Sequence, residues 1–352
     1  MRRIYVCHTY YHVYVSLLKE FYEYGGRQNE ATICLSKMST DFSDLSQRIQ
    51  KMDLFEAVVE LDEKSYTFFP ELEKYKVNTG NVLHNLWNRL IFTKRFPKLE
   101  EPYITVDFSQ YDEIYVYCDA DPIGYYLNYK RIRYHAVEDG LDTLKPFIQA
   151  IYDNKSLFKL KKFLSLYLNL LFIRDGYSKY CIDMEVNDLS VLADDFYKYK
   201  ELPRKKMTDS LTEEQKDIIL NIFVKDIDAL RRSLSHKDGE TKSILILTEP
   251  LCALDVRERL FRDLVEEYDG EGTVYLKPHP RDVLNYRELF PEHVVFEALM
   301  PMEVFSFCKE GKFDKVVSVL TQLGCADFAE EKVYLGYDFL DKYEDPAVHR
   351  KG

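Results

Sequence analysis

Strand-like and helix-like segments alternate along most of the chain, and this alternation restricts its fold more than any other feature. Short apolar runs such as "RIYVC", "ATICLS", "AVVEL" and "EIYVYC" recur in the first half, separated by helix-like or polar segments. The alternation starts again after residue 242, where "SILIL", "TVYL" and "KVVSVL" are the strand-like runs. Strands that alternate with helices are typical of parallel sheets covered by helices. The sequence therefore predicts an α/β fold with two Rossmann-like, parallel-sheet domains.

A polar segment separates the two blocks. The run "SHKDGETK" at 235–242 has the composition of a linker, and a chain of 352 residues exceeds the usual size of one domain. We expect a first domain over 1–235, with a helical insert at about 150–235 because the pattern is helical from 156 to 200 and from 212 to 234. The second domain is expected over 243–340. Two such domains are expected to face a cleft, with ligands bound beyond the carboxyl ends of the strands.

Composition excludes several classes of function. The net charge of -12 argues against nucleic-acid binding. The seven cysteines are scattered singly, which indicates reduced core residues rather than disulfides or zinc ligands. The N-terminus "MRRIYVCHTYYHVYV" makes a poor signal peptide, and no apolar run is long and uncharged enough to cross a bilayer. We therefore expect a cytoplasmic protein.

The stretch "YLKPHPRD" places His279 between two prolines, directly after a strand-like run. Proline fixes its own φ and keeps the preceding residue out of the helical region, so His279 sits on stiff, extended backbone. Lys277 and Arg281 add positive charge beside it. The alternative interpretation of this octapeptide is a proline-rich surface turn.

Further polar residues follow other strand-like runs of the second domain. Glu249 follows "SILIL", and Glu297 follows "VVF", where a carboxylate could bind ribose hydroxyls. Ser318 and Thr321 lie between a strand and an expected helix start, where hydroxyls and free backbone N–H groups bind phosphate. Each also has a structural interpretation, since Thr321 could be only an N-cap and Glu297 only a solvated turn residue.

The motif "EDG" at Glu138, Asp139 and Gly140 follows the strand-like run "YHAV". Adjacent carboxylates at a strand end could supply a general base, because the charge of one acid raises the pKa of its neighbour. An ordinary acidic turn is the alternative. The motif "DADP" at 119–122 has the DxD form with which GT-A glycosyltransferases bind a metal and a nucleotide diphosphate, but a loop acid pair is favoured here.

In this order, "EDG", "KPHP" and a strand ending in Ser/Thr resemble the bacterial sialyltransferases of the GT-B fold that decorate lipooligosaccharides and capsules. The resemblance implies inverting transfer of sialic acid from CMP-sialic acid to a glycan hydroxyl, without a metal or other cofactor. It implies an acceptor-side first domain and a nucleotide-sugar-binding second domain. The implied roles are general base for the "EDG" carboxylates, leaving-group assistance for His279 with Lys277, phosphate binding for Ser318 and Thr321, and ribose binding for Glu297.

Several alternatives stay open. In the lipooligosaccharide branch the base is thought to follow the first strand of the second domain, which makes Glu249 a rival of Glu138. The donor could instead be CMP-Kdo or a UDP-hexose, since no residue selects sialic acid. A protein of a different class, a noncatalytic or phosphotransfer protein of capsule assembly, would share the α/β halves but lack the paired base and acid.

The segment 155–173 is apolar, with four lysines (155, 159, 161 and 162) in its first half. A buried or homodimer-forming helix is one interpretation. The other is an interfacial helix that docks on the inner face of the membrane, where lipid-linked acceptors reside. The lysines and the length of the segment are inconsistent with a membrane span.

Overall fold

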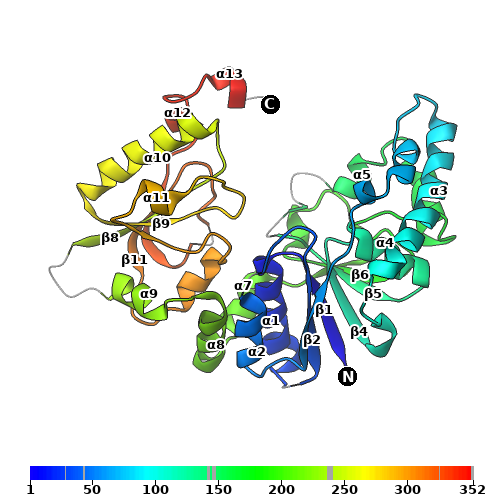
Figure 1. Cartoon of the computed structure of the whole chain (residues 1–352), viewed down its shortest axis with the longest axis horizontal. Helices are drawn as coiled ribbons and strands as arrows, with labels where there is room; N and C mark the ends of the chain where they lie inside the picture. Colours follow the sequence, from blue (N-terminus) through cyan, green and yellow to red (C-terminus); the bar gives the residue numbers. More distant parts are fainter. Residues whose placement is uncertain are drawn as a thin grey trace. The chain divides into compact units, whose positions relative to one another are not determined.

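The computed structural model describes residues 1–27, 29–42, 44–140, 143–144, 148–235, 241–324 and 326–349. The chain forms two compact units, Met1–Thr212 and Glu213–Gly352 (Figure 1). The boundary lies before the predicted position at residue 235, because the two helices from Glu213 to Leu234 belong to the second unit. Of the predicted linker at 235–242, residues 236–240 lie outside the described part of the chain.

The first unit is built on a seven-stranded parallel sheet with the order β3-β2-β1-β4-β5-β6-β7. Its strands are β1 (Arg3–Cys7), β2 (Ala31–Ser36), β3 (Ala57–Leu61), β4 (Glu113–Tyr117), β5 (Tyr134–Val137), β6 (Cys181–Val186) and β7 (Tyr199–Glu201). Every residue of β1 and β2 is buried, as expected for central strands that are covered on both faces.

Helices cover this sheet (Figure 1). They are α1 (Tyr10–Tyr24), α2 (Leu45–Lys51), α3 (Val82–Glu100), α4 (Pro122–Lys130), α5 (Gln149–Tyr152), α6 (Phe158–Leu166) and α7 (Arg204–Asp209). The Thr9 side chain caps α1 by accepting the backbone N–H of His12, and Gly25 ends it in the left-handed conformation. Only His8 and Thr9 separate β1 from α1, which holds His8 and His12 at the carboxyl edge of the sheet.

The predicted helical insert at about 150–235 is wrong in its middle, from 181 to 201, where the structure has strands. Residues 156–200 contain α6, but they also contain β6 and most of β7, which extend the first sheet by two strands. In β6, "CIDMEV", the side chains of Cys181, Met184 and Val186 are buried in the same apolar cluster as β5. The packing of these three side chains in the core favours a strand more strongly than the helical pattern of the surrounding sequence favours a helix.

The second unit is built on a five-stranded parallel sheet with the order β10-β9-β8-β11-β12. Its strands are β8 (Lys242–Leu247), β9 (Gly272–Lys277), β10 (Val294–Val295), β11 (Phe313–Ser318) and β12 (Ala329–Tyr334). The helices are α8 (Glu213–Phe223), α9 (Ile227–Leu234), α10 (Leu254–Asp269), α11 (Tyr286–Leu289), α12 (Tyr337–Leu340) and α13 (Pro346–His349). Helix α10, yellow in Figure 1, runs along this sheet and buries Leu260, Phe261 and Leu264 against β8 and β9.

Two parallel α/β sheets confirm the predicted fold class. Of the six described cysteines, which are free, Cys7, Cys34 and Cys181 are buried as expected of core residues, whereas Cys118, Cys252 and Cys308 are only partly buried; Cys325 lies outside the described residues. Among the helices that the structure describes, none combines the length and apolarity needed to span a bilayer.

Candidate active site

Side chains that are distant in the sequence meet at the carboxyl edge of the first sheet. They come from the loops after β1, β3, β4 and β5 and from the first turn of α1: His8, His12, Glu63, Asp121 and Asp139. The strand order β3-β2-β1-β4-β5 places these loops next to one another. Open parallel sheets bind their ligands at this edge.

Asp139, one of the two predicted "EDG" acids, is oriented by His12. The Nε2 of His12 donates to Oδ1 of Asp139 at 2.8 Å, and its Nδ1 accepts the backbone N–H of His8 at 3.0 Å. Burial lowers the pKa of His12, so the ring is neutral with its proton on Nε2. The hydrogen bond from His12 holds the pKa of Asp139 well below its usual range. Because the Asp139 side chain is 50% exposed, it presents an oriented, ionised carboxylate that a substrate can reach.

Glu138 is buried and engaged with the backbone. Its carboxylate accepts the N–H of Asn187 at 2.8 Å, and the N–H of Leu144 and the hydroxyl of Thr143 both at 3.3 Å. Glu138 therefore joins the turn after β5 to the loop after β6. The raised pKa expected for one acid of the pair is not found at Asp139, because the hydrogen bond from His12 lowers the pKa of Asp139 more than burial raises it.

His8 links two further acids. Its Nε2 lies 2.6 Å from Oε1 of Glu63 and 3.5 Å from Oδ2 of Asp121. Burial alone would lower the pKa of His8, but the charge and hydrogen bond of Glu63, together with the charges of Asp121 and Asp139, raise it. Glu63 also accepts the hydroxyl of Ser36 at 2.6 Å and the N–H of Ile123 at 2.8 Å. Burial raises the pKa of Asp121 to about 6, so Asp121 is a second carboxylate at this edge with a suitable pKa for proton transfer.

The loop that carries Asp121 has an unusual backbone. Cys118 adopts φ 54°, the left-handed region that non-glycine residues rarely occupy, and its Sγ donates to Oδ1 of Asp139 at 2.9 Å. A Cβ on Gly124 would lie 1.9 Å from the carbonyl oxygen of Asp119, so only glycine fits where α4 packs on this loop. Backbone strain of this kind is concentrated at functional sites.

The two acids of "DADP" have different environments. Asp119 is buried and accepts the N–H of Asp175 at 2.9 Å and the hydroxyl of Tyr134 at 3.3 Å, so its carboxylate is bound by other residues of the protein and stabilises this loop.

In the described part of the chain, two groups of side chains at this edge could hold a metal ion, because their ligand atoms lie within 4.8 Å of one another. They are His8, Cys118 and Asp121, and His12, Cys118 and Asp139. Metal independence therefore stays a prediction.

In the second unit, His279 follows β9 at the carboxyl edge. Its backbone N–H donates to the hydroxyl of Thr248 at 3.3 Å, and its Nδ1 accepts the N–H of Arg281 at 3.1 Å. In the neutral ring the proton is therefore on Nε2. Burial lowers the pKa of His279, and the charges of Arg281 and Lys277 lower it further. His279 is thus a neutral hydrogen-bond donor that is aimed by the backbone.

A buried ion pair supports this loop. Nη1 of Arg257 lies 2.7 Å from Oδ1 of Asp282, and the hydroxyl of Tyr286 donates to Oδ2 of Asp282 at 2.7 Å. The same guanidinium donates to the carbonyl oxygens of Leu251 and Cys252 in the loop after β8. The loops after β8 and β9 are therefore held together, which fixes the position of His279.

Glu249 follows β8 and reaches the loop after β11. Its carboxylate accepts the N–H of Leu320 at 3.0 Å and the N–H of Thr321 at 2.8 Å, while the hydroxyl of Ser318 donates to the carbonyl of Thr321 at 2.7 Å. The chain turns after β11 without forming the predicted helix, so the helix N-terminus expected to bind phosphate is absent from these described residues. The two N–H groups nevertheless bind an anionic oxygen, which here belongs to Glu249.

Lys277 and Glu297 lie on neighbouring strand ends. The ammonium of Lys277 is buried and donates to the carbonyls of Pro278 at 2.9 Å and Ala298 at 2.8 Å, and burial lowers its pKa to about 7. Glu297 is partly exposed and forms an ion pair with Arg287 at 2.8 Å. The structure thus brings Glu249, Lys277, His279, Ser318 and Thr321 to three adjacent strands, with Glu297 at the end of the next one.

Sequence reasoning missed His8, His12 and Glu63. The signal that could have found them is position, since His8 directly follows a buried strand in "RIYVCH" and Glu63 comes two residues after "AVVEL". The same signal identified Glu249 and Glu138. The partners of His12, in contrast, depend on strand order and could not be read from the sequence.

The model of glycosyltransferase family 52 matches residues 88–319. An uncharacterised protein of Haemophilus influenzae is 28% identical over 233 residues, which cover 63% of this chain and 68% of that protein. A 2,6-sialyltransferase from a Photobacterium species, solved with the donor product CMP and the acceptor lactose, superposes with a TM-score of 0.53 at 9% identity, covering 95% of this chain and 71% of that chain. An α-2,3-sialyltransferase of Photobacterium phosphoreum has a TM-score of 0.50 at 10% identity, covering 94% and 89%.

These matches confirm the predicted resemblance in family and fold, and they favour an enzyme over a noncatalytic assembly protein. Because the family model covers more than half of the chain, the protein belongs to glycosyltransferase family 52 and has the GT-B fold.

Proposed function

We propose that this glycosyltransferase moves sialic acid from CMP-sialic acid to a hydroxyl of a lipooligosaccharide or capsule glycan, with inversion and without a metal or other cofactor. The observation that carries the proposal is the orientation of His279, whose Nδ1 accepts a backbone N–H and whose Nε2 therefore presents an N–H that can donate a hydrogen bond to a leaving group. The fold is shared with a sialyltransferase solved with CMP and lactose, which supports this choice of donor and acceptor.

The second unit binds the donor in this proposal. Cleavage of the bond between the anomeric carbon and the CMP oxygen leaves negative charge on the phosphate and an oxocarbenium-like sugar. The N–H at Nε2 of His279 donates a hydrogen bond to that phosphate and stabilises its negative charge as the bond breaks. Ser318 and Thr321 are assigned to the phosphate, Lys277 adds positive charge at the same edge of the sheet, and Glu297 binds the ribose.

The first unit binds the acceptor and supplies the base. The acceptor oxygen bonds to the anomeric carbon from the face opposite the phosphate, and its proton passes to a carboxylate. We assign that role to Asp139 rather than Glu138 or Glu249, since the carboxylates of Glu138 and Glu249 accept backbone N–H groups while Asp139 is half exposed. Asp121, with a pKa of about 6, is the alternative base.

Donor choice is tested by nucleotide release. CMP-sialic acid, CMP-Kdo and UDP-glucose are each incubated with the full-length protein and lactose, and free CMP or UDP and the product are quantified. We expect CMP release coupled to sialyl-lactose formation from the first donor alone. Turnover of CMP-Kdo or UDP-glucose in its place would identify the alternative donor and contradict the proposal.

We also propose that the protein is cytoplasmic and binds peripherally at the inner face of the membrane through 155–173. On and next to α6, the side chains of Leu157, Leu160, Phe163, Tyr167 and Leu168 are exposed. Exposed apolar residues next to lysines are typical of interfacial helices. A homodimer formed through the same side chains is the alternative partner.

A further inference from the structure

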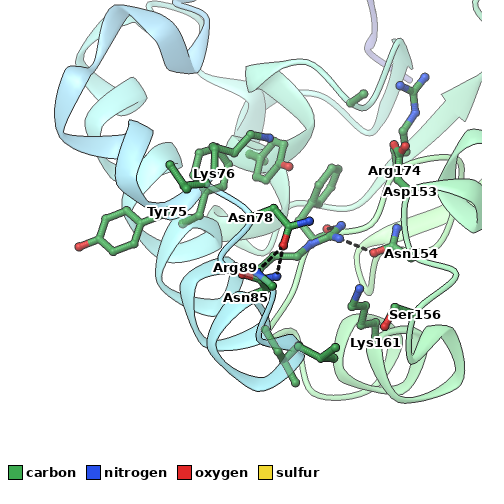
Figure 2. Close-up of a pocket in the computed structure, with 18 residues that line it drawn as sticks. Tyr75, Lys76, Asn78, Asn85, Arg89, Asp153, Asn154, Ser156, Lys161 and Arg174 are labelled. Carbon is green, nitrogen blue, oxygen red and sulfur yellow. Dashed lines mark hydrogen bonds between the residues drawn. The ribbon is translucent and has the colours of Figure 1, made fainter.

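The first unit contains a cavity of about 740 Å³ that the proposed chemistry does not use. Figure 2 shows it between α3, the end of α5, α6 and the segment before α3. Its volume is in the range of pockets that hold small ligands. Ala120 and Arg174 also line it, and Ala120 immediately precedes Asp121, so the cavity extends to the candidate active-site edge.

Four cationic side chains line this cavity: Lys76, Arg89, Lys161 and Arg174. Arg174 is paired with Asp175 at 2.8 Å. The guanidinium of Arg89, in contrast, donates to the neutral oxygens of Asn154 and Phe172 (Figure 2). Within the described residues, no carboxylate forms an ion pair with Lys76, Arg89 or Lys161. Asp153 is the one acidic residue in the lining.

This positive charge is only partly compensated, by the single carboxylate of Asp153. Burial lowers the pKa of Arg89, and burial together with the charge of Arg89 lowers the pKa of Lys161. A bound anion would stabilise both cations in this partly buried cavity, because a guanidinium and an ammonium bind carboxylate and phosphate oxygens strongly.

The rest of the lining suits a sugar. Aromatic rings contribute apolar surface, and amides and a hydroxyl contribute donors and acceptors; these residues are Tyr75, Phe92, Tyr125, Phe172, Asn78, Asn85, Asn154 and Ser156. The amide of Asn85 donates to Asn78 at 2.7 Å, which orients both side chains (Figure 2). A few placed polar groups among aromatic walls are typical of specific small-molecule sites.

We infer that this cavity is an acceptor subsite that binds a sugar carrying a carboxylate or phosphate group, with Arg89 and Lys161 as the anion ligands. The inference rests on the proposed function insofar as it calls the sugar an acceptor. The cavity reaches the loop that carries Asp121, so one sugar of a glycan could occupy the cavity while another sugar of the same glycan lies at the candidate base. The enzyme would therefore prefer acceptor glycans that carry an anionic sugar over neutral ones.

The test measures binding without a donor, by calorimetric titration of the full-length protein. The probes are lactose, lactose 1-phosphate and lactobionic acid, which carry no charge, a phosphate and a carboxylate. We expect at least one anionic probe to bind about tenfold more tightly than lactose at low salt, as one or two charge-assisted hydrogen bonds provide. The preferred anion identifies the group that the subsite recognises.

Three variants decide the outcome. Lys161→Met and Arg89→Gln should each remove most of the anionic preference and leave lactose binding within about twofold. Lys159→Gln is the matched control, because Lys159 is an exposed lysine on the same helix and does not line the cavity. Equal affinity for all three probes, or a preference that survives in both cavity variants, would overturn the inference. Binding that follows these expectations in a protein that transfers no sialic acid would contradict the proposed function alone.

Discussion

The Nε2 of His12 donates to Oδ1 of Asp139 at 2.8 Å, while the backbone of His8 fixes the opposite nitrogen of the same ring. A buried neutral imidazole thus aims a half-exposed carboxylate, an arrangement that positions a proton acceptor. The carboxylate of Glu138, its sequence neighbour, joins two loops. The two acids of "EDG" therefore have separate roles.

Asp139→Asn should lower kcat by about 100- to 10,000-fold, the usual contribution of general base catalysis. The affinity for CMP should change little, because the second unit binds it in our proposal. Glu138→Gln should instead lower the thermal midpoint and retain most of kcat in the folded fraction. Rates at saturating donor and calorimetric scans measure both effects. A near-normal kcat in Asp139→Asn, with a loss confined to Glu138→Gln or Glu249→Gln, would show that the base is assigned wrongly.

The pH dependence separates Asp139 from Asp121. A carboxylate with a lowered pKa stays ionised as the pH falls, so catalysis by Asp139 should persist well below pH 6, whereas a base with a pKa of about 6 would lose activity near that pH. His12→Phe removes the hydrogen bond that lowers the pKa of Asp139, so the acid limb of kcat/KM should move to higher pH.

His12→Gln should partly restore the original profile, because the glutamine amide can also donate to Asp139. A purely structural role of His12 would lower the folded fraction and leave the profile of the remaining activity unchanged. An acid limb near pH 6 in the unmodified enzyme that disappears in Asp121→Asn would identify Asp121 as the base.

The fold was predictable where an apolar run of strand length is bounded on both sides by polar segments. The buried runs of β1, β2, β8 and β11 stand between polar segments, and each is a strand. The errors fall where local pattern and packing conflict. "CIDMEV" joins a sheet beside helical neighbours, and the loop after Ser318 is closed by Glu249 instead of starting a helix.

The candidate site was predictable only in part, for a physical reason. The rigidity of His279 comes from adjacent prolines, which are local and visible in "KPHP". The geometry of Asp139 depends on His12, which is 127 residues away and reaches Asp139 only because β1, β4 and β5 are neighbours in the sheet. Such pairings follow from strand order, which a single sequence does not determine.

His279→Ala should lower kcat by about 100- to 10,000-fold and weaken CMP binding only a few-fold, because leaving-group assistance is needed mainly in the transition state. His279→Gln, which keeps an N–H donor, should retain more activity than His279→Ala. Single-turnover rates and titration with CMP separate the two effects. A loss of CMP affinity that accounts for the whole loss of kcat/KM would make His279 a binding residue instead.

Removal of divalent cations tests the proposed metal independence. Enzyme treated with EDTA should retain full turnover of CMP-sialic acid, since a hydrogen bond from His279 to the phosphate and proton transfer to Asp139 are proposed to support the reaction. Added Mn²⁺ or Mg²⁺ should not increase the rate. Loss of activity in EDTA that Mn²⁺ restores would point to the groups that share Cys118, and Cys118→Ser would then be expected to weaken the response to Mn²⁺.

The exposed apolar face of α6 and its surroundings predicts binding to anionic membranes. Trp87, the single tryptophan, is 63% exposed on α3, which lines the same cavity as α6. Vesicles of one part phosphatidylglycerol to two parts phosphatidylcholine should therefore shift its fluorescence to shorter wavelength. Each lysine near an anionic surface contributes about 1 kcal/mol to the free energy of membrane binding. Because salt screens this attraction, added salt should weaken the binding. Phe163→Glu should reduce membrane binding strongly, while Val283→Glu, at an exposed position of the second unit, should not.

Two results together would instead assign this face to a second copy of the chain. They are an unshifted tryptophan spectrum with vesicles, and a dimer in sedimentation that Phe163→Glu dissociates.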